Sequence, residues 1–198
     1  MSRFDTTAEA VRVVLAPFGA LRPQFPADWN GEIALHPSLI RFYGEVGPYG
    51  EDGPHGPDGL TIPTTGNAFA IPPLARLWEG QAGYRWHGLT GKRLAGWRDE
   101  WLVVADQGGD PFILDGTTGA VLHAHHGGGA WEPEPIFADV FAMALVLGTI
   151  GAVHEEGGEG LYDEEFEVRP AWRAVLRARL APSVGETEAD SIASRFGW

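Results

Sequence analysis

The sequence predicts an α+β fold in which helices pack against an antiparallel sheet. Three runs of about five residues, "WLVVA", "PFILD" and "AVLHAH", are rich in Val, Ile, Leu and Phe. The connections between them, "DQGGD" and "GTTG", are too short for a crossover helix, so the runs form an antiparallel meander. Helical patterns precede these strands and a strongly apolar helix, from about Ile136 to Val153, follows them, an order typical of the α+β class.

Two amphipathic helices are expected at the start of the chain. Thr6 and Glu9 form a capping box, and apolar residues then recur with helical spacing, which predicts a helix from Thr6 to Phe18. The Pro-rich connector "LRPQFPADWNG" follows, and its prolines exclude a regular helix or a central strand. Pro37 then opens a second, short helix whose apolar side chains repeat the helical spacing as far as Val46.

Two less regular segments separate these helices from the strands. The segment "GPYGEDGPHGPDG", from Gly47 to Gly59, is almost entirely Gly, Pro and acid, which predicts an exposed loop. In "NAFAIPPLARLWEG", the spacing of Leu74, Leu77 and Trp78 predicts one or two helical turns.

The composition changes abruptly after the apolar helix. The segment "HEEGGEGLYDEEFEV" has seven acidic residues and no Lys or Arg, as expected of a linker or an exposed acidic loop. Pro170 then opens a helix with one apolar stripe, and Ser183 with Glu186 predicts the cap of a last short helix. We therefore expect a domain over residues 1–153, followed over 154–198 by an acidic linker and a C-terminal helical extension that docks on it.

The composition is that of a globular protein. Of the 198 residues 44% are hydrophobic, and 8 Trp and 10 Phe supply an ample core. The chain has no cysteine, which excludes disulfides, zinc–cysteine sites, thiol nucleophiles and iron–sulfur clusters. The N-terminus lacks the pattern of a secretory signal, and the longest apolar run, Val140 to Ile150, is too short to span a bilayer. We therefore expect a cytoplasmic protein.

The charge balance is strongly acidic, with 14 Lys and Arg against 27 Asp and Glu and a net charge of −13. Such a chain repels phosphate backbones and anionic lipids, so neither nucleic acids nor membranes are expected partners. A basic protein is the better match, although the charge also fits a role in solubility alone.

The common catalytic motifs are missing from the sequence. There is no GxSxG elbow, and none of the five serines follows a predicted strand. "GLTGKR" lacks the glycine spacing and the hydroxyl residue of a phosphate-binding loop, and "GGDPFILDGTTG" does not open a helix. Carboxylates are so abundant that no single pair stands out as acid–base machinery. We therefore expect no enzyme activity, no cofactor and no catalytic residues.

The histidines of "HAHHGG" leave one alternative open. In a strand, His123 and His125 lie on one face and His126 on the other, so two imidazoles are able to share a metal with a third ligand from elsewhere. The available carboxylates are Asp110, Asp115 and Glu132. Because the helical spacing of HExxH and a second ligand pair are both missing, we expect partly exposed strand histidines and no metal. A small metal-dependent hydrolase using His123 and His125 stays as the alternative.

The Gly and Asp residues between the strands are expected to be architectural. Gly108 and Gly109 allow positive φ, the flanking aspartates bond nearby amides, and Pro111 cannot continue a ladder. "DGTTG" repeats this arrangement at the next turn. The residues of the two turns are Asp106, Gly108, Gly109, Asp110, Pro111, Asp115 and Gly116.

Five segments follow one another in this chain: "LIRFYGEVGP", "AFAIPPLARLW", "WLVVADQGGDPFILDGTTGAVLHAHHG", a tryptophan, and the closing "FADVFAMALVL". Their order resembles that of the SMI1/KNR4 proteins of the SUKH superfamily. The resemblance covers about two thirds of the chain, from Pro23 to Val153, and "VVADQGGDPFILD" is its most recognisable part. It implies a curved antiparallel sheet of several strands with helices packed on it. It associates no catalytic residues with the signature.

The resemblance also implies a function. Bacterial members are immunity proteins that bind and neutralise a cognate toxin, often a nuclease or deaminase of a contact-dependent or polymorphic toxin system, and fungal relatives are linked to cell-wall regulation. Toxins that act on nucleic acid tend to be basic, so an acidic inhibitor is steered towards them. We therefore expect a non-enzymatic binding protein for a basic toxin domain, itself a monomer or weak homodimer.

The expected contacts are acids of two loops together with nearby aromatic residues. They are Tyr49, Glu51, Asp52, Asp58, Trp131, Glu155, Glu156, Glu159, Tyr162, Asp163, Glu164, Glu165 and Glu167. Aromatic side chains supply anchors, and acidic ones raise the association rate. A second alternative is a regulatory or scaffold module that docks through the loop from Gly47 to Gly59.

Overall fold

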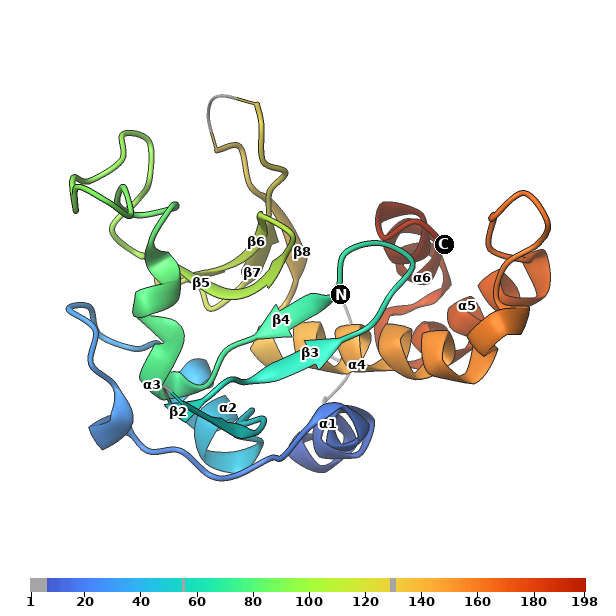
Figure 1. The fold of residues 1–198 in the computed structure, drawn as a ribbon, viewed down its shortest axis with the longest axis horizontal. Helices are drawn as coiled ribbons and strands as arrows, with labels where there is room; N and C mark the ends of the chain where they lie inside the picture. Colours follow the sequence, from blue (N-terminus) through green and yellow to red (C-terminus); the bar gives the residue numbers. More distant parts are fainter. Residues whose placement is uncertain (1–6, 55, 129–130) are drawn as a thin grey trace.

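A computed structural model describes residues 7–54, 56–128 and 131–198 of the chain (Figure 1). Within these residues a six-stranded antiparallel sheet follows the chain order, and helices cover one of its faces. The strands of this sheet are β3 (Leu60–Ile62), β4 (Phe69–Ile71), β5 (Trp101–Gln107), β6 (Asp110–Asp115), β7 (Val121–His123) and β8 (Glu134–Phe137). The α+β class and the antiparallel meander predicted from the sequence are confirmed.

The central strands are buried on both faces. In β5 and β6, Leu102 and Phe112 face the core beneath the helices, whereas Val103 and Ile113 belong to a second apolar cluster. A strand that is covered on both sides needs apolar residues at every position. This is why "WLVVA" and "PFILD" show no alternation of apolar and polar residues.

An irregular segment, residues 82–100, covers the second face of the sheet. It follows two short helical turns, α3 (Leu74–Leu77) and η3 (Glu79–Gln81), where helical turns were expected. Trp97 from this segment packs edge-on against Trp101 with ring centroids 5.5 Å apart. At a bulge in β5, the side-chain amide of Gln81 takes the place of a neighbouring strand, since it accepts from Val103 N and donates to Val103 O, both at 2.9 Å.

The outer strands were not predicted from the sequence. β3 and β4 have three residues each, too few to show a period of two. The closing helix was expected to start at about Ile136, but this residue lies in β8, and the helix begins only at Val140. β8 is an edge strand that pairs with β7 alone. Pro135 has no N–H group to donate, and an edge strand tolerates this because one of its sides has no neighbouring strand.

The first two helices form as predicted. They are α1 (Ala8–Leu15), continued by the turn η1 (Ala16–Phe18), and α2 (Pro37–Glu45). The cap of α1 is Thr7, whose hydroxyl accepts from Ala10 N at 3.2 Å, whereas Thr6 lies outside the described residues. The connector between them holds the turn η2 (Pro26–Asp28) and otherwise irregular chain.

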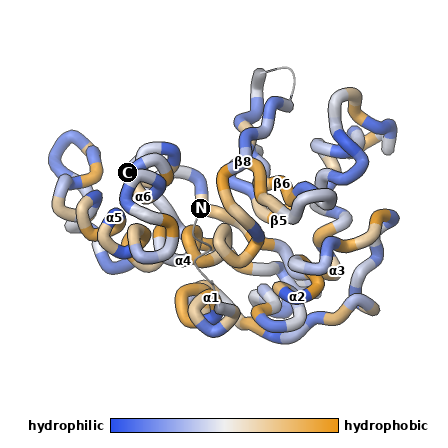
Figure 2. The backbone as a smooth tube through the Cα atoms, turned by 180° about the vertical axis from the view of Figure 1, so that it is seen from behind, coloured by the Kyte–Doolittle hydropathy of each residue, from blue (hydrophilic) through white to orange (hydrophobic). Residues whose placement is uncertain are grey.

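The helix α4 (Val140–Gly157) is the centre of the core. The Asp139 carboxylate caps it by accepting from Ala142 N at 2.9 Å, and the helix contacts α1, α2, β3 and β8. Figure 2 shows hydrophobic residues along α1, α4 and β6. By length and composition alone the segment Val140–Gly160 is apolar enough to cross a membrane, but 61% of its 18-residue apolar window is buried inside the protein, as expected of a core helix.

The C-terminal segment packs into the same core. It contains the turn η4 (Gly158–Gly160) and the helices α5 (Pro170–Val184) and α6 (Glu186–Arg195). Leu176, Leu180, Ile192 and Phe196 belong to the same apolar cluster as the strands. The expected cap at Ser183 is wrong, because this residue lies in the last turn of α5 and α6 begins after Gly185 without a side-chain cap.

The expected loop from Gly47 to Gly59 is exposed only at its centre. A small hairpin, β1 (Asp52–Gly53) and β2 (Gly56–Pro57), forms there, and His55 lies outside the described residues. Both ends of the segment are buried, because the chain enters and leaves beside α2 and β3.

Candidate functional site

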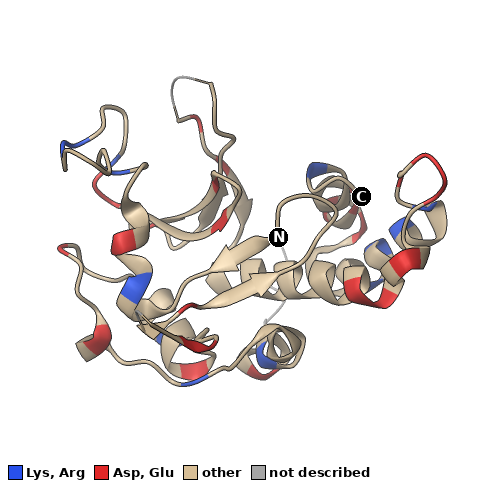
Figure 3. Cartoon of the chain, in the orientation of Figure 1, with Lys and Arg blue, Asp and Glu red and all other residues tan. Residues whose placement is uncertain are grey.

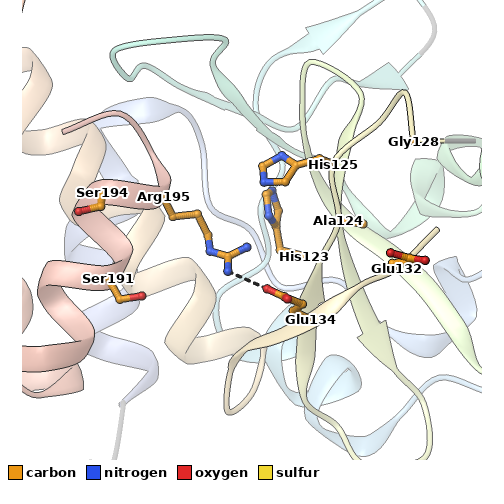
Figure 4. Close-up of a pocket in the computed structure, with 9 residues that line it drawn as sticks. All are labelled: His123, Ala124, His125, Gly128, Glu132, Glu134, Ser191, Ser194 and Arg195. Carbon is orange, nitrogen blue, oxygen red and sulfur yellow. Dashed lines mark hydrogen bonds and ion pairs between the residues drawn. The ribbon is translucent and has the colours of Figure 1, made fainter. Parts of the chain in front are cut away.

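A cleft of about 650 Å³ lies between α6 and the end of the sheet (Figure 4). The strands β7 and β8 and the chain after β7 form one wall, and the last turns of α6 form the other. The residues that line it are His123, Ala124, His125, Gly128, Glu132, Glu134, Ser191, Ser194 and Arg195.

The wall of this cleft contains one deeply buried imidazole. His123 is only 2% exposed, because Phe112 and Phe196 pack against its ring with centroids 4.7 and 5.7 Å away. Neither ring nitrogen has a hydrogen-bond partner among the described residues. Burial, helped by the nearby His125 and Arg195, lowers the pKa of His123 to about 4, so the ring is neutral at physiological pH.

Asp110 holds two exposed histidines in place, of which His125 lines the cleft. Its carboxylate lies 3.0 Å from His125 Nδ1 and 2.6 Å from His126 Nδ1, and it accepts from His126 N at 2.7 Å. Burial raises the pKa of Asp110, but these hydrogen bonds outweigh it and the net shift is downward. A bond to Nδ1 fixes the ring of His125 and leaves its other nitrogen free to face a ligand.

An ion pair bridges the two walls. Arg195 on α6 reaches across to Glu134 on β8, with 3.1 Å between nitrogen and oxygen (dashed in Figure 4). In this view the pair lies beside His123 and below His125, between the helix and the strand.

A second hollow of about 430 Å³ shares His125 and Arg195 with the first. Its other walls are the turn before β4, the end of β5 and the segment after α4. The two hollows together are here termed the α6 cleft. Tyr162, Phe166 and Glu167 form its outer rim, so the acidic segment expected to be a linker borders this cleft.

The acidic segment is an ordered loop between η4 and α5. Asp163 Oδ1 accepts from the backbone N–H groups of Glu165 and Glu167 at 3.0 and 2.9 Å, and Tyr162 pairs with Val168. This tight turn holds Phe166 at a φ of 62° with 86% of its surface exposed. The segment of residues 161–168 is here termed the acidic loop.

The predicted contact residues do not form one surface. The acids near the hairpin and those of the acidic loop lie far apart (Figure 3). Near the hairpin, Tyr49 donates to Asp52 at 2.7 Å, and Asp58 accepts from Glu51 N at 2.8 Å, so two of these acids stabilise their own loop. The two groups of predicted contacts therefore lie on separate parts of the molecule.

Other predicted contacts have structural partners. Trp131 packs against Tyr84 and Trp97, with ring centroids 5.4 and 5.9 Å apart, and so belongs to the second apolar cluster. Glu155 and Glu156 form the last turn of α4, not a linker, and Glu156 makes a two-pronged ion pair with Arg179 at 2.7 and 2.6 Å. Glu159, Glu164 and Glu165 are exposed.

The predicted turns have the architectural geometry. Gly108 and Gly109 adopt φ of 63° and 103°, and Asp106 accepts from Gly109 N at 3.1 Å and from the Tyr84 hydroxyl. In the second turn Asp115 accepts from the amides of Thr117 and Thr118 at 2.8 and 3.2 Å, and Gly116 donates to Glu100 O at 2.8 Å. Pro111 lies inside β6, opposite Asp106.

The histidine pair is arranged differently from the expectation. The structure brings His123 and His125 together, with ring centroids 5.0 Å apart, but β7 ends at His123, and that ring is buried rather than partly exposed. No group of three or more His, Asp or Glu side chains among the described residues has the arrangement of a metal site.

Sequence reasoning missed Phe166 and the α6 side of the cleft. A single Phe among acids in "YDEEFEV" was a usable signal for an exposed aromatic residue. No local signal marked Arg195, which meets β8 only in the folded chain. Comparison with known protein families, with characterised proteins and with solved structures found no match for this chain.

Proposed function

We propose that this protein binds and neutralises a basic partner protein, in the manner of an immunity protein bound to its toxin. The observation that carries the proposal is Phe166, an exposed aromatic side chain at the centre of the acidic loop. A large, exposed aromatic ring surrounded by acids matches the composition of a binding hot spot, in which an aromatic anchor is ringed by polar contacts.

The backbone of Phe166 supports this interpretation. A residue with a Cβ at a φ of 62° is strained by roughly 1–2 kcal/mol, and glycine would avoid the strain. With 86% of its surface in solvent, Phe166 gains little from packing in exchange. Strain that gives the fold no benefit is typical of residues that serve binding.

The charge around Phe166 selects the partner. Glu155, Glu159, Glu164 and Glu165 are exposed, and none takes part in an ion pair within the described residues. Together with a net charge of −13, they attract a positively charged surface and repel nucleic acid and anionic lipid. A basic protein domain, such as that of a toxin acting on nucleic acid, is the partner proposed.

Growth rescue tests the proposal. Each toxin encoded beside this gene is expressed in a sensitive host with and without this protein, and binding is then measured by calorimetry with an inactivated toxin. We expect one basic toxin domain to be neutralised by direct binding. If every neighbouring toxin kills the host equally with and without this protein, the proposal is wrong.

Phe166→Ser tests the anchor. Loss of a hot-spot residue costs about 2 kcal/mol or more, so the affinity for the toxin should fall at least about 30-fold. The matched control is Phe25→Ser, which removes a Phe that is 63% exposed in the connector before α2. Equal affinities of the two variants would remove Phe166 from the interface.

A further inference from the structure

The α6 cleft combines negative charge with a polar group that has no partner. Among the described residues that line it, the carboxylates are Asp110, Glu132, Glu134 and Glu167, and the guanidinium is that of Arg195. With neutral histidines the lining therefore carries a net charge of about −3. The charge alone favours a cation over an anion as the occupant.

His123 adds an independent requirement. A neutral imidazole has one N–H donor and one nitrogen lone pair, and neither is used by the described residues. Its ring lines the cleft with both nitrogens buried, and the two nitrogens point to different sides of the ring, so an occupant that presses against this wall is placed to partner one of them. The occupant must therefore supply a hydrogen-bond acceptor or donor at this wall.

Phosphate and carboxylate ligands supply acceptors but meet four carboxylates, and an apolar ligand satisfies neither nitrogen of His123. An extended polypeptide offers a carbonyl acceptor and an N–H donor at every residue. If it also carries arginine or lysine, its cationic side chain pairs with Glu132 or Glu134.

We infer that the α6 cleft binds an extended segment of the partner protein that carries arginine or lysine side chains. This inference rests on the proposed function, since the segment belongs to the basic partner. A backbone carbonyl of the segment accepts from His123, and a cationic side chain lies between Glu132 and Glu134. The segment then continues past His125 and Arg195 to the rim at Phe166, so the cleft and the acidic loop form one binding surface.

The first test uses a fluorescent peptide of Gly and Ser with three arginines, titrated with the full-length protein at physiological ionic strength. We expect saturable binding, and no binding of the same peptide with citrulline at each arginine position. Citrulline keeps the shape and removes the charge. Failure of the arginine peptide to bind, or equal binding of the citrulline peptide, would overturn the inference.

Two cleft variants and one control variant show where the peptide binds. Glu132→Gln with Glu134→Gln, and separately His123→Phe, should each weaken binding at least about tenfold. The matched control, Glu9→Gln with Glu32→Gln, makes the same change of net charge at two exposed acids outside both the cleft and the acidic loop, and should alter affinity less than about threefold. If the control weakens binding as much as the cleft variants do, the peptide is held by the overall negative charge of the protein rather than by the cleft, and the inference is wrong. If His123→Phe does not fold, the peptide affinity of the Glu132→Gln, Glu134→Gln variant decides the test, because both of these residues are exposed.

Growth rescue by the same variants separates this inference from the proposed function. When the cleft variants neutralise the toxin fully and Phe166→Ser does not, the partner uses the acidic loop alone and the cleft inference fails. When no neighbouring toxin is neutralised by the unaltered protein, the proposed function fails. We expect both Phe166→Ser and the cleft variants to lose neutralisation.

Discussion

Charged and titratable groups from two strands, from the segment after β7 and from one helix surround His123. Arg195 on α6 and His125 after β7 disfavour its protonation, whereas Asp110 on β6 favours it and Glu134 lies opposite it on β8. Burial by Phe112 and Phe196 outweighs the favourable charge, and the pKa falls from 6.5 to about 4. The unfolded chain therefore binds more protons than the folded chain between these two values.

We predict that acid destabilises this protein through His123. Because the unfolded state binds the extra proton, the free energy of unfolding falls as pH falls from 6.5 towards 4. The loss should reach about 2–3 kcal/mol near pH 4.5. His123→Phe removes the titrating group and should flatten this dependence, as measured by urea unfolding at pH 7 and near pH 4.5. An equally steep dependence in the variant would assign the acid sensitivity to other residues.

Asp110 affects the free energy of unfolding over a lower pH range than His123 does. Its pKa is lowered in the folded state, so its contribution to stability is present above its ordinary pKa of 3.8 and is lost only as pH falls below that value. A titration kept above about pH 4.5 therefore reports on His123 rather than on Asp110.

The burial of His123 depends on a residue distant in the sequence, and the backbone conformation of Phe166 depends on the hydrogen bonds of its own turn. "AVLHAH" predicts a strand, but not that Phe196 from α6 closes over His123. Likewise, "DEEFEV" predicts exposure of the acids, but the φ of 62° at Phe166 comes from the hydrogen bonds of Asp163. The turn residues Gly108 and Gly109 were predictable because the requirement for positive φ is local.

At the scale of elements, two glycines set how closely α4 approaches its neighbours. A Cβ on Gly151 would lie 2.3 Å from Ile62 and 2.7 Å from Phe18, and a Cβ on Gly148 would lie 2.7 Å from Val14. Glycine within a helix is intrinsically unfavourable, so these residues are retained for packing. The helix therefore packs directly on β3 and on the first helix.

We predict that Gly151→Ala lowers the free energy of unfolding by about 1–3 kcal/mol, because overpacking outweighs the better helix propensity of alanine. The matched control is Gly44→Ala in α2, where no atom lies within 4 Å of the added Cβ. This control should raise stability by about 0.5–1 kcal/mol. Chemical denaturation of both variants checks the pair, and a stabilising Gly151→Ala would contradict the close packing.

The length of the apolar pattern in each element explains which elements were predictable from the sequence. The first two helices, α5 and the strands β5 and β6 have periodic or continuous apolar patterns over five or more residues. β3, β4 and β8 are short, and their pairing is decided by the strands beside them, so "LTI" and "FAI" show no signal. β8 was assigned to the helix because its Ile136 and Phe137 adjoin the apolar run of α4.

At the scale of the whole molecule, the C-terminal helices complete the core instead of decorating it. Leu176, Leu180, Ile192, Phe196 and Trp198 are each at most 5% exposed and share one apolar cluster with the sheet. Buried aliphatic and aromatic side chains contribute roughly 1.5–3 kcal/mol each. The five together contribute about 8–15 kcal/mol, which is comparable to the net stability of a typical domain, about 5–15 kcal/mol.

We therefore predict that a chain ending at Arg169 does not fold cooperatively, although the sequence suggested a domain over residues 1–153. Removal of α5 and α6 exposes the side of α4 and β7 that they cover. Circular dichroism melting and gel filtration check this, with full-length protein as reference. A truncated chain that melts cooperatively as a monomer would make the helices a true extension.

The uneven charge of the whole molecule leads to the last prediction, which concerns association with the partner. Long-range attraction acts before contact, so it raises the association rate and is screened by salt, whereas the anchor acts after contact and slows dissociation. Raising salt from about 0.05 M to about 0.5 M should therefore lower the association rate at least about tenfold and change the dissociation rate little.

Neutralising Glu155, Glu159, Glu164 and Glu165 with glutamine should lower the association rate and flatten its salt dependence, because these exposed acids contribute to the negative electrostatic potential near Phe166. Phe166→Ser should instead raise the dissociation rate. Stopped-flow measurements with the toxin identified by growth rescue separate the two effects, and an association rate that is independent of salt would show that these four acids have no part in attracting the partner.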